Sequence, residues 1–263
     1  MLKSSELRLC KTLDVDQSID DIDLDWLSGD IHVLLSEDEF IHVIQYADKR
    51  YSERKLMQHR INGNQLSIVD GRKKGGFIGF NIGRTALELQ VPHRILNSIL
   101  VKTTGGQLEL KGIRANRCQC KVTSGSLTMS GTMEKLEVHA TASDVYADHI
   151  KADRFVLHSS SSKIEITGEF QHVESKTTGR GLHMDCLQTP NSFHSISTGM
   201  KCVVHIPDRE GFEVQLNERS GTLKSDFELT PLQCERKRLS YNNGEKQFYI
   251  DIRGGSFHLK RRS

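Results

Sequence analysis

The chain has 263 residues, with 36 lysines and arginines against 34 aspartates and glutamates and a formal net charge of +2. This near-balance, together with the lack of aromatic residues among the basic clusters, argues against a dedicated nucleic-acid binder. Hydrophobic residues make up 36% of the chain and aromatic residues 6%. The composition indicates a folded protein with a thin core and excludes a collagen and a long coiled coil.

The N-terminus and the cysteines bear on the compartment. Met1–Glu6 opens into a polar segment without the apolar stretch of a secretory signal. No run approaches the roughly 18 apolar residues that a membrane-spanning helix needs. Six cysteines are spread along the chain without a C-x-x-C pair, a pattern typical of free thiols in a reducing compartment. We therefore expect a cytoplasmic protein without a transmembrane segment, for which a surface location would require another export route.

Residues 1–95 are predicted to form a β-rich N-terminal cap and the first coils of the fold. Met57–Ile61 and Gln65–Val69 flank an Asn-Gly pair and are expected to form a hairpin. The glycine-rich segment Gly75–Phe80 lacks the Gly-Lys-Ser/Thr ending of a phosphate-binding loop, so we interpret it as a turn or connection. Thr85–Pro92 alternates apolar and polar residues up to a proline and predicts a strand.

Residues 96–230 contain a repeated phrase, in which Thr or Ser and small turn residues precede an apolar-polar-apolar run. The first apolar residues of successive runs are spaced by 19, 18, 19 and 18 residues: Leu108, Leu127, Val145, Ile164 and Leu182. A second alternating pair precedes each turn, as at Cys118/Cys120 and Leu136/Val138. Each repeat is therefore two short strands joined by a tight corner, and it holds too little apolar surface to fold without stacking on its neighbours.

These patterns predict an all-β fold, a single-stranded β-helix or β-solenoid with coils of 18–20 residues. We expect one domain over residues 1–263, in which residues 231–263 form a C-terminal cap. The basic segments Arg236–Arg238 and Lys260–Arg262 are interpreted as parts of that cap, which would block end-to-end pairing of exposed strand edges.

The stacking also predicts columns of like positions, about 4.8 Å apart from coil to coil. One outward column is basic, and it consists of Lys102, Lys121, His139, His158 and Lys176. Such a stripe would bind an anionic partner more strongly as the pH falls through the range in which histidine titrates. This stripe is the candidate functional site.

Two patterns suggest other chemistry. Cys118 and Cys120 are candidate ligands of a soft metal, but they align with apolar pairs and are better explained as small core residues. Polysaccharide lyases and hydrolases use carboxylates on the outside of β-helices, and this chain has scattered acids at Glu109, Asp144, Asp148 and Glu165. No paired-carboxylate signature stands out among them. We therefore expect no catalytic residue, no metal and no cofactor.

Three stretches carry a resemblance to a known family. They are Ile22-Asp23-Leu24-Asp25 followed by Ser28-Gly29-Asp30-Ile31, the strand end Leu89-Gln90-Val91-Pro92, and the run of Thr-Ser-Gly-Ser-Leu phrases. With these the chain resembles the bacterial putative-adhesin family of β-solenoid domains of unknown function. The resemblance covers nearly the whole chain. It implies a right-handed single-stranded β-helix with no established catalytic residues.

From the residues and the resemblance we expect a non-catalytic interaction or scaffold protein whose partner is a protein or a polysaccharide. Two alternatives stay open. One is a carbohydrate-active β-helix enzyme, which would show convergent acids from one or two coils. The other is a structural protein that assembles with itself through its coil ends into a dimer or a filament.

Overall fold

The computed structural model describes residues 7–72, 83–232, 237–242 and 244–262. These residues form β-strands and one short 3-10 turn, η1 (Glu53–Lys55), and the described part contains no α-helix. The predicted all-β class is confirmed. The chain divides into two compact units, residues 1–131 and 132–263, which we describe in turn. The glycine-rich segment Gly75–Phe80 lies outside the described residues.

Unit 1 holds nine complete strands and the first residues of a tenth. They are β1 (Arg8–Val15), β2 (Asp21–Trp26), β3 (Asp30–Leu35), β4 (Ile41–Ala47), β5 (Gln58–Asn62), β6 (Gln65–Val69), β7 (Thr85–Val91), β8 (Leu96–Thr103), β9 (Gly106–Thr123) and the start of β10 (Gly125–Thr141). β5 and β6 pair antiparallel, from Gln58 opposite Val69 to Asn62 opposite Gln65, and Gly63 turns the chain with a φ of 58°. The predicted hairpin is thereby confirmed.

Strands β2 and β3 form an inner coil of unit 1, that is, a coil with a paired strand on each of its two edges. β2 pairs in parallel with β6 on one side and with β8 on the other, so that Leu24 lies opposite both Ile68 and Val101. β3 is likewise placed between β7 and β9. Alternate side chains of β2 point into the core, where Leu24 and Trp26 are fully buried. β1, by contrast, is paired with β4 alone among the described strands.

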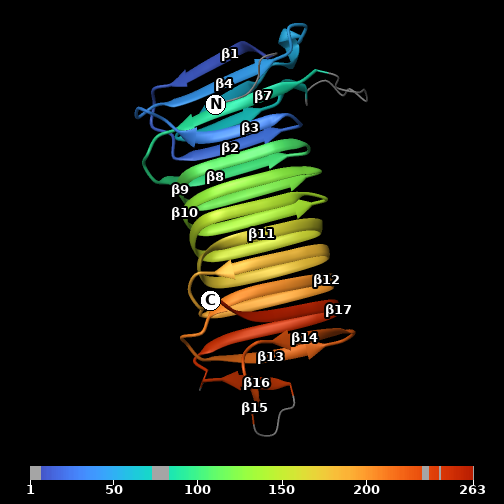
Figure 1. Cartoon of the computed structure of the whole chain (residues 1–263). Coiled ribbons are helices and arrows are strands. Elements are labelled where there is room, and N and C mark those ends of the chain that lie inside the picture. Colours follow the sequence, from blue (N-terminus) through green and yellow to red (C-terminus); the bar gives the residue numbers. More distant parts are fainter. Residues whose placement is uncertain (1–6, 73–82, 233–236, 243, 263) are drawn as a thin grey trace. The chain divides into compact units, whose positions relative to one another are not determined.

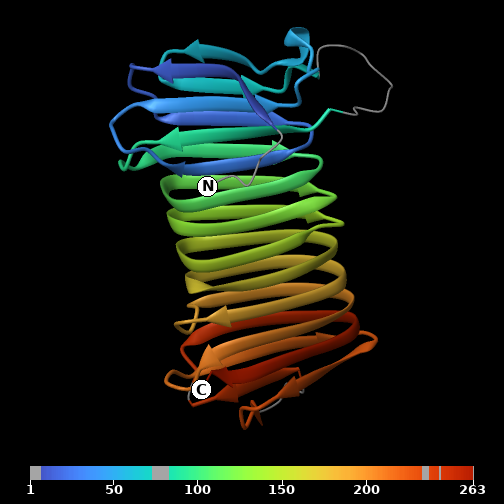
Figure 2. The same cartoon turned by 45° about the horizontal axis from the view of Figure 1, so that its top comes forward.

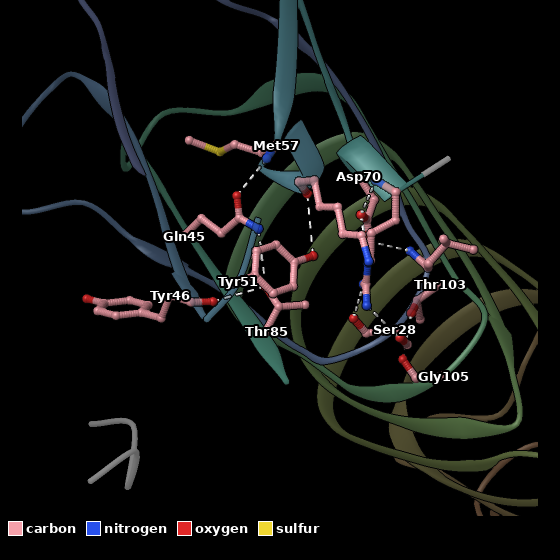
Figure 3. A network of polar contacts seen from close by, with 12 residues as sticks. Ser28, Gln45, Tyr46, Tyr51, Met57, Asp70, Thr85, Thr103 and Gly105 are labelled. Carbon is pink, nitrogen blue, oxygen red and sulfur yellow. Dashed lines mark hydrogen bonds and ion pairs between the residues drawn. The ribbon is translucent and has the colours of Figure 1, made fainter. Parts of the chain in front are cut away.

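A buried polar network holds the chain beside β2 and β3 (Figure 3). The guanidinium of Arg72 donates to both carboxylate oxygens of Asp70 and, over 3.1 Å, to the hydroxyl of Ser28. Gln45 donates from its side-chain amide to the hydroxyl of Thr85 at 3.2 Å. Because buried polar groups are costly when unpaired, these bonds hold the segment after β6 to the corner after β2, and β4 to β7.

Unit 2 contains the rest of β10 and seven further strands. They are β11 (Asp144–Cys186), β12 (Ser192–Pro207), β13 (Phe212–Glu218), β14 (Gly221–Ser225), β15 (Thr230–Pro231), β16 (Arg238–Tyr241) and β17 (Lys246–Arg262). β11 is long because its strand runs on through corners, where Ser161 and Arg180 take the left-handed conformation. β11 and β12 pair in parallel with like positions together, for example Thr178 opposite Thr198. This register is that of a β-solenoid.

The last strand of the chain is an inner coil of unit 2. β17 pairs in parallel with β12 on one side and with β13 and β14 on the other, as its red ribbon between orange ones shows in Figures 1 and 2. The sequence predicts a cap over residues 231–263, but 246–262 do not form one. They alternate like the neighbouring coils, and neighbouring strands pair with both of their edges.

Aromatic residues close the core of unit 2 beyond β17. The ring of Phe212 stacks on that of Phe248 at 4.8 Å and meets the ring of Phe227 edge-on at 5.1 Å. Tyr241 packs against both Phe212 and Phe227. Such pairs contribute about 0.5–1.5 kcal/mol each beyond the area they bury. The segments after β12, not the C-terminal strand, thus cover this end of the core.

Candidate functional site

Unit 1 holds the first two residues of the basic stripe. Lys102 on β8 lies opposite Lys121 on β9, as the repeat predicts. On its other side Lys102 lies opposite Asp25 of β2. The inner coil β2–β3 thus brings a carboxylate next to the stripe, and the sequence spacing gave no sign of this neighbour. Lys121 is exposed and Lys102 half-buried.

Unit 2 holds the other three residues of the stripe. The imidazole rings of His139 on β10 and His158 on β11 are stacked, with centroids 4.9 Å apart and an angle of 19° between their planes. Lys176, also on β11, is exposed. The pKa of His158 lies below its ordinary value of 6.5, chiefly because the ring is partly buried and secondly because His139 is close. Lys176 lowers that pKa further, whereas the carboxylates of Glu137 and Glu174 oppose the shift.

Carboxylates and further cations lie beside these residues. Glu137 lies 2.6 Å from Nε2 of His139 and forms an ion pair of 3.1 Å with Lys135. Glu174 forms an ion pair of 3.1 Å with Arg154. The stripe is therefore one column of a mixed surface, not an isolated row of positive charge. We name Lys135, Glu137, His139, Arg154, His158, Glu174 and Lys176 together the 135–176 patch.

The sequence analysis missed Lys135 and Arg154, although a signal for them was present. Each directly precedes an inward-facing residue of the repeat, Leu136 and Phe155, and the two cations are spaced like those residues. The patch then has three permanent cations, two carboxylates and two imidazoles.

A second pair of neighbouring histidines lies elsewhere on unit 2, with the ring planes tilted by 42°. The rings of His183 on β11 and His205 on β12 have centroids 4.9 Å apart. The pKa of His205 is lowered, first by burial and then by the nearby His183. Acids accompany this pair too, and each pairs with a cation, as in the 135–176 patch: Asp185 with Arg262 at 2.8 Å, and Asp226 with His258 at 2.8 Å.

The candidate metal site is a part of the core. Cys118 and Cys120 are buried among apolar side chains, as expected for small hydrophobic residues. The pKa of the Cys120 thiol is raised, first by a hydrogen bond with Cys118 and then by burial. Raising this pKa disfavours the thiolate that would bind a metal. The described residues contain no group of three or more side chains that could hold a metal ion.

The scattered acids form ion pairs with different cations. The four pairs are Glu109 with Lys111 at 2.6 Å, Asp144 with Arg180 at 2.9 Å, Asp148 with His149 at 2.9 Å and Glu165 with Lys163 at 2.7 Å. The pKa of Glu109 is lowered, mainly by its hydrogen bond with Lys111. A general acid in a glycosidase needs the opposite shift. Glu109 is therefore arranged as a surface ion pair.

The part of the chain that the structure describes has no helix of the length and apolarity required to span a membrane. Its long elements are strands with alternating burial, such as β12.

The model of the family described as Toastrack DUF4097 matches residues 19–256. The chain belongs to this family. The match runs from just before β2 into β17, and so includes both inner coils. No curated protein matches the chain.

Two solved structures show the same fold. A "putative lipid binding protein" from Parabacteroides distasonis is 12% identical, with a TM-score of 0.52 over 96% of each chain. A "putative adhesin" from Parabacteroides merdae is 10% identical, with a TM-score of 0.50 over 98% of this chain and 97% of that one. At these identities the similarity concerns the fold. The predicted membership of a family with putative-adhesin members is confirmed.

Proposed function

We propose that this protein is a non-catalytic, adhesin-like interaction or scaffold protein that binds a partner through the outward faces of its coils. The observation that carries the proposal is the ordered arrangement of outward charges on the rigid ladder of unit 2. Glu137 lies between Lys135 and His139, and Glu174 pairs with Arg154. Such a surface offers a partner many fixed polar contacts, as the faces of other solenoids do.

We propose a right-handed single-stranded helix with coils of 18–20 residues. Register pairs such as Leu96 with Ala115 and Thr178 with Thr198 support that coil length. Parallel crossovers within a sheet are right-handed in about 98% of cases, which supports the hand. An experimental structure with left-handed coils would contradict it.

A capture experiment with matched variants tests the binding role. The full chain is used as bait in an extract of its own cells, with chemical crosslinking and mass spectrometry as the readout. Arg154→Glu reverses an exposed charge in the 135–176 patch, and Lys201→Glu makes the same change at an exposed position outside the patch. We expect one partner to be captured by the wild type and by Lys201→Glu, and to be lost with Arg154→Glu.

Two results would overturn this proposal. The first is capture that Arg154→Glu leaves unchanged, or no specific capture at all. The second is turnover of a polysaccharide by the purified chain, measured as new reducing ends or unsaturated products, which would favour the enzyme alternative. Self-assembly is recognised separately, as a mass that grows with protein concentration in light scattering.

A further inference from the structure

Two stacked imidazoles lie among the charges of the 135–176 patch. Neutral imidazoles stack without electrostatic cost, whereas two imidazolium rings 4.9 Å apart repel one another. The groups that act on His158 are His139, Glu137, Glu174 and Lys176, and His139 itself contacts Glu137. Every one of these groups belongs to the patch. Protonation of the pair therefore changes the charge of the patch as a whole.

The charge balance of the patch depends on these two rings. With both imidazoles neutral, Lys135, Arg154 and Lys176 exceed the two carboxylates by a single charge. With both protonated, the cations exceed the carboxylates by three. The cations also lie on both sides of the acids: Lys135 and Arg154 pair with Glu137 and Glu174 from one side, and His139 contacts Glu137 from the other.

We propose that the 135–176 patch is a binding site for an acidic polysaccharide, which it engages when His139 and His158 are protonated. This inference rests on the proposed binding function and names its partner class. Successive coils lie about 4.8 Å apart, so the cations follow one another along the ladder, as the sulfates or carboxylates do along an extended acidic glycan. The patch has no Phe, Tyr or Trp on which nucleic-acid bases could stack, which favours a glycan over a single-stranded nucleic acid.

Binding and protonation are reciprocal at this site. A bound anion stabilises the imidazolium, so it raises the pKa of His158 back toward or above its ordinary value, opposing the effects of burial and of His139. Burial and the neighbouring His139 and Lys176 favour the neutral form of the ring in the free protein. The patch should therefore take up protons as it binds, and binding should strengthen as the pH falls.

The pair His183 and His205 provides a matched control. It has the same ring separation, and the same kinds of group act on His205 as on His158: burial, a second imidazole, two carboxylates and a lysine. Asp185 and Asp226 lie among its neighbours and raise the pKa of His205, while Lys260 lowers it. Lys260 and Arg262 balance Asp185 and Asp226 there. Protonation of His183 and His205 therefore leaves a smaller excess of positive charge than protonation of the two rings in the 135–176 patch.

The experiment measures binding of the full chain to immobilised dextran sulfate, with neutral dextran as the control polymer. Dextran sulfate stays ionised throughout, so any pH dependence belongs to the protein. Between about pH 7.5 and about pH 5 we expect the affinity for dextran sulfate to rise at least roughly tenfold, with no binding to dextran. The double substitution His139→Gln and His158→Gln should abolish the rise, and His183→Gln with His205→Gln should leave it intact. NMR titration of His158 should show its pKa raised by the polymer.

Several outcomes would overturn the inference. They are an affinity independent of pH, a rise that persists in the His139/His158 double variant, or duplex DNA binding as tightly as the glycan. Circular dichroism of each variant separates lost binding from lost folding, and the NMR titration of the wild-type chain tests the linkage without any substitution. If capture of a partner depends on Arg154 but not on pH, this inference fails while the proposed function stands. If capture does not depend on Arg154, the proposed function fails.

Discussion

At the corners of the coils, the φ angle of the backbone and the distance to the neighbouring coil limit which residues fit. Ser124, Ala142, Ser161 and Arg180 take the left-handed conformation, which costs a non-glycine residue about 1–2 kcal/mol. The corner tolerates them because a side chain there points to open space, as at Gly179, where an added Cβ meets nothing within 4 Å. Gly125, which follows Ser124, is different. A Cβ on Gly125 would lie 2.4 Å from the carbonyl oxygen of Gly106 in the adjacent coil.

Two alanine substitutions separate backbone strain from steric exclusion. In Gly179→Ala the added Cβ meets no neighbouring atom, and the only cost is that of a non-glycine residue at a φ of 62°. We therefore expect a loss of about 1 kcal/mol in the free energy of unfolding. Gly125→Ala must also push two coils apart, and we expect a loss of about 2–3 kcal/mol. Urea unfolding followed by circular dichroism measures both. Equal losses at the two positions would show that the coils do not approach as closely as described.

At the scale of elements, β1 is held to unit 1 by one edge and by side-chain contacts. It pairs with β4, and Nζ of Lys11 donates to the carbonyl oxygen of Met57 at 2.8 Å. His42 on β4 lies between two carboxylates, with Nδ1 2.7 Å from Asp14 of β1 and Nε2 3.0 Å from Asp38. The hydrogen bond with Asp14 first, and that with Asp38 second, raise the pKa of His42 above 6.5. The protonated ring thus bridges β1 to the turn before β4.

This bridge makes the docking of β1 dependent on pH. Because the folded-state pKa of His42 is raised, its stabilisation is fully present below the unfolded value of 6.5 and is lost as the pH rises through the folded value. We expect faster amide exchange in β1 above that value, after correction for the intrinsic exchange rate. His42→Gln should remove the pH dependence. Protection of β1 that stays constant through the titration of His42 would contradict the assignment.

At the scale of the whole molecule, both ends of the chain contribute inner coils. In unit 1, β2 and β3 lie between strands that follow them in the chain, and in unit 2, β17 lies between β12 and the pair β13 and β14. In sequence, β4 to β7 lie between β3 and β8, and β13 to β16 lie between β12 and β17. In each unit, the inner coil therefore pairs with at least one strand that is far from it in sequence, such as β2 with β8 and β17 with β12.

Two truncations test the importance of the inner position. Removal of residues 246–263 deletes β17 and leaves Phe193 of β12 and Phe212 of β13 without Phe248, the ring that both contact. We expect β13 to β16 to lose amide protection and the protein to aggregate through the open edge of β12. Removal of residues 1–15 deletes a strand paired along one edge and should leave the remaining strands protected. Retained protection of β13 in the first truncation would show that β17 is dispensable.

The strand class, the inward and outward alternation and the hairpin at Gly63 could be predicted from the sequence, because these depend on neighbouring residues and on a repeat of constant length. The sequence also indicated that Lys102 and Lys121 share a column, and that Cys118 and Cys120 face the core. Only the tertiary structure decided that β2, β3 and β17 are inner coils. It also revealed the acids beside the stripe: Asp25, Glu137 and Glu174. The physical reason is that alternation specifies which face of a strand is buried but not which strands pair with its two edges. A coil from the chain's end satisfies the same hydrogen bonds and the same core as a coil that follows directly in sequence.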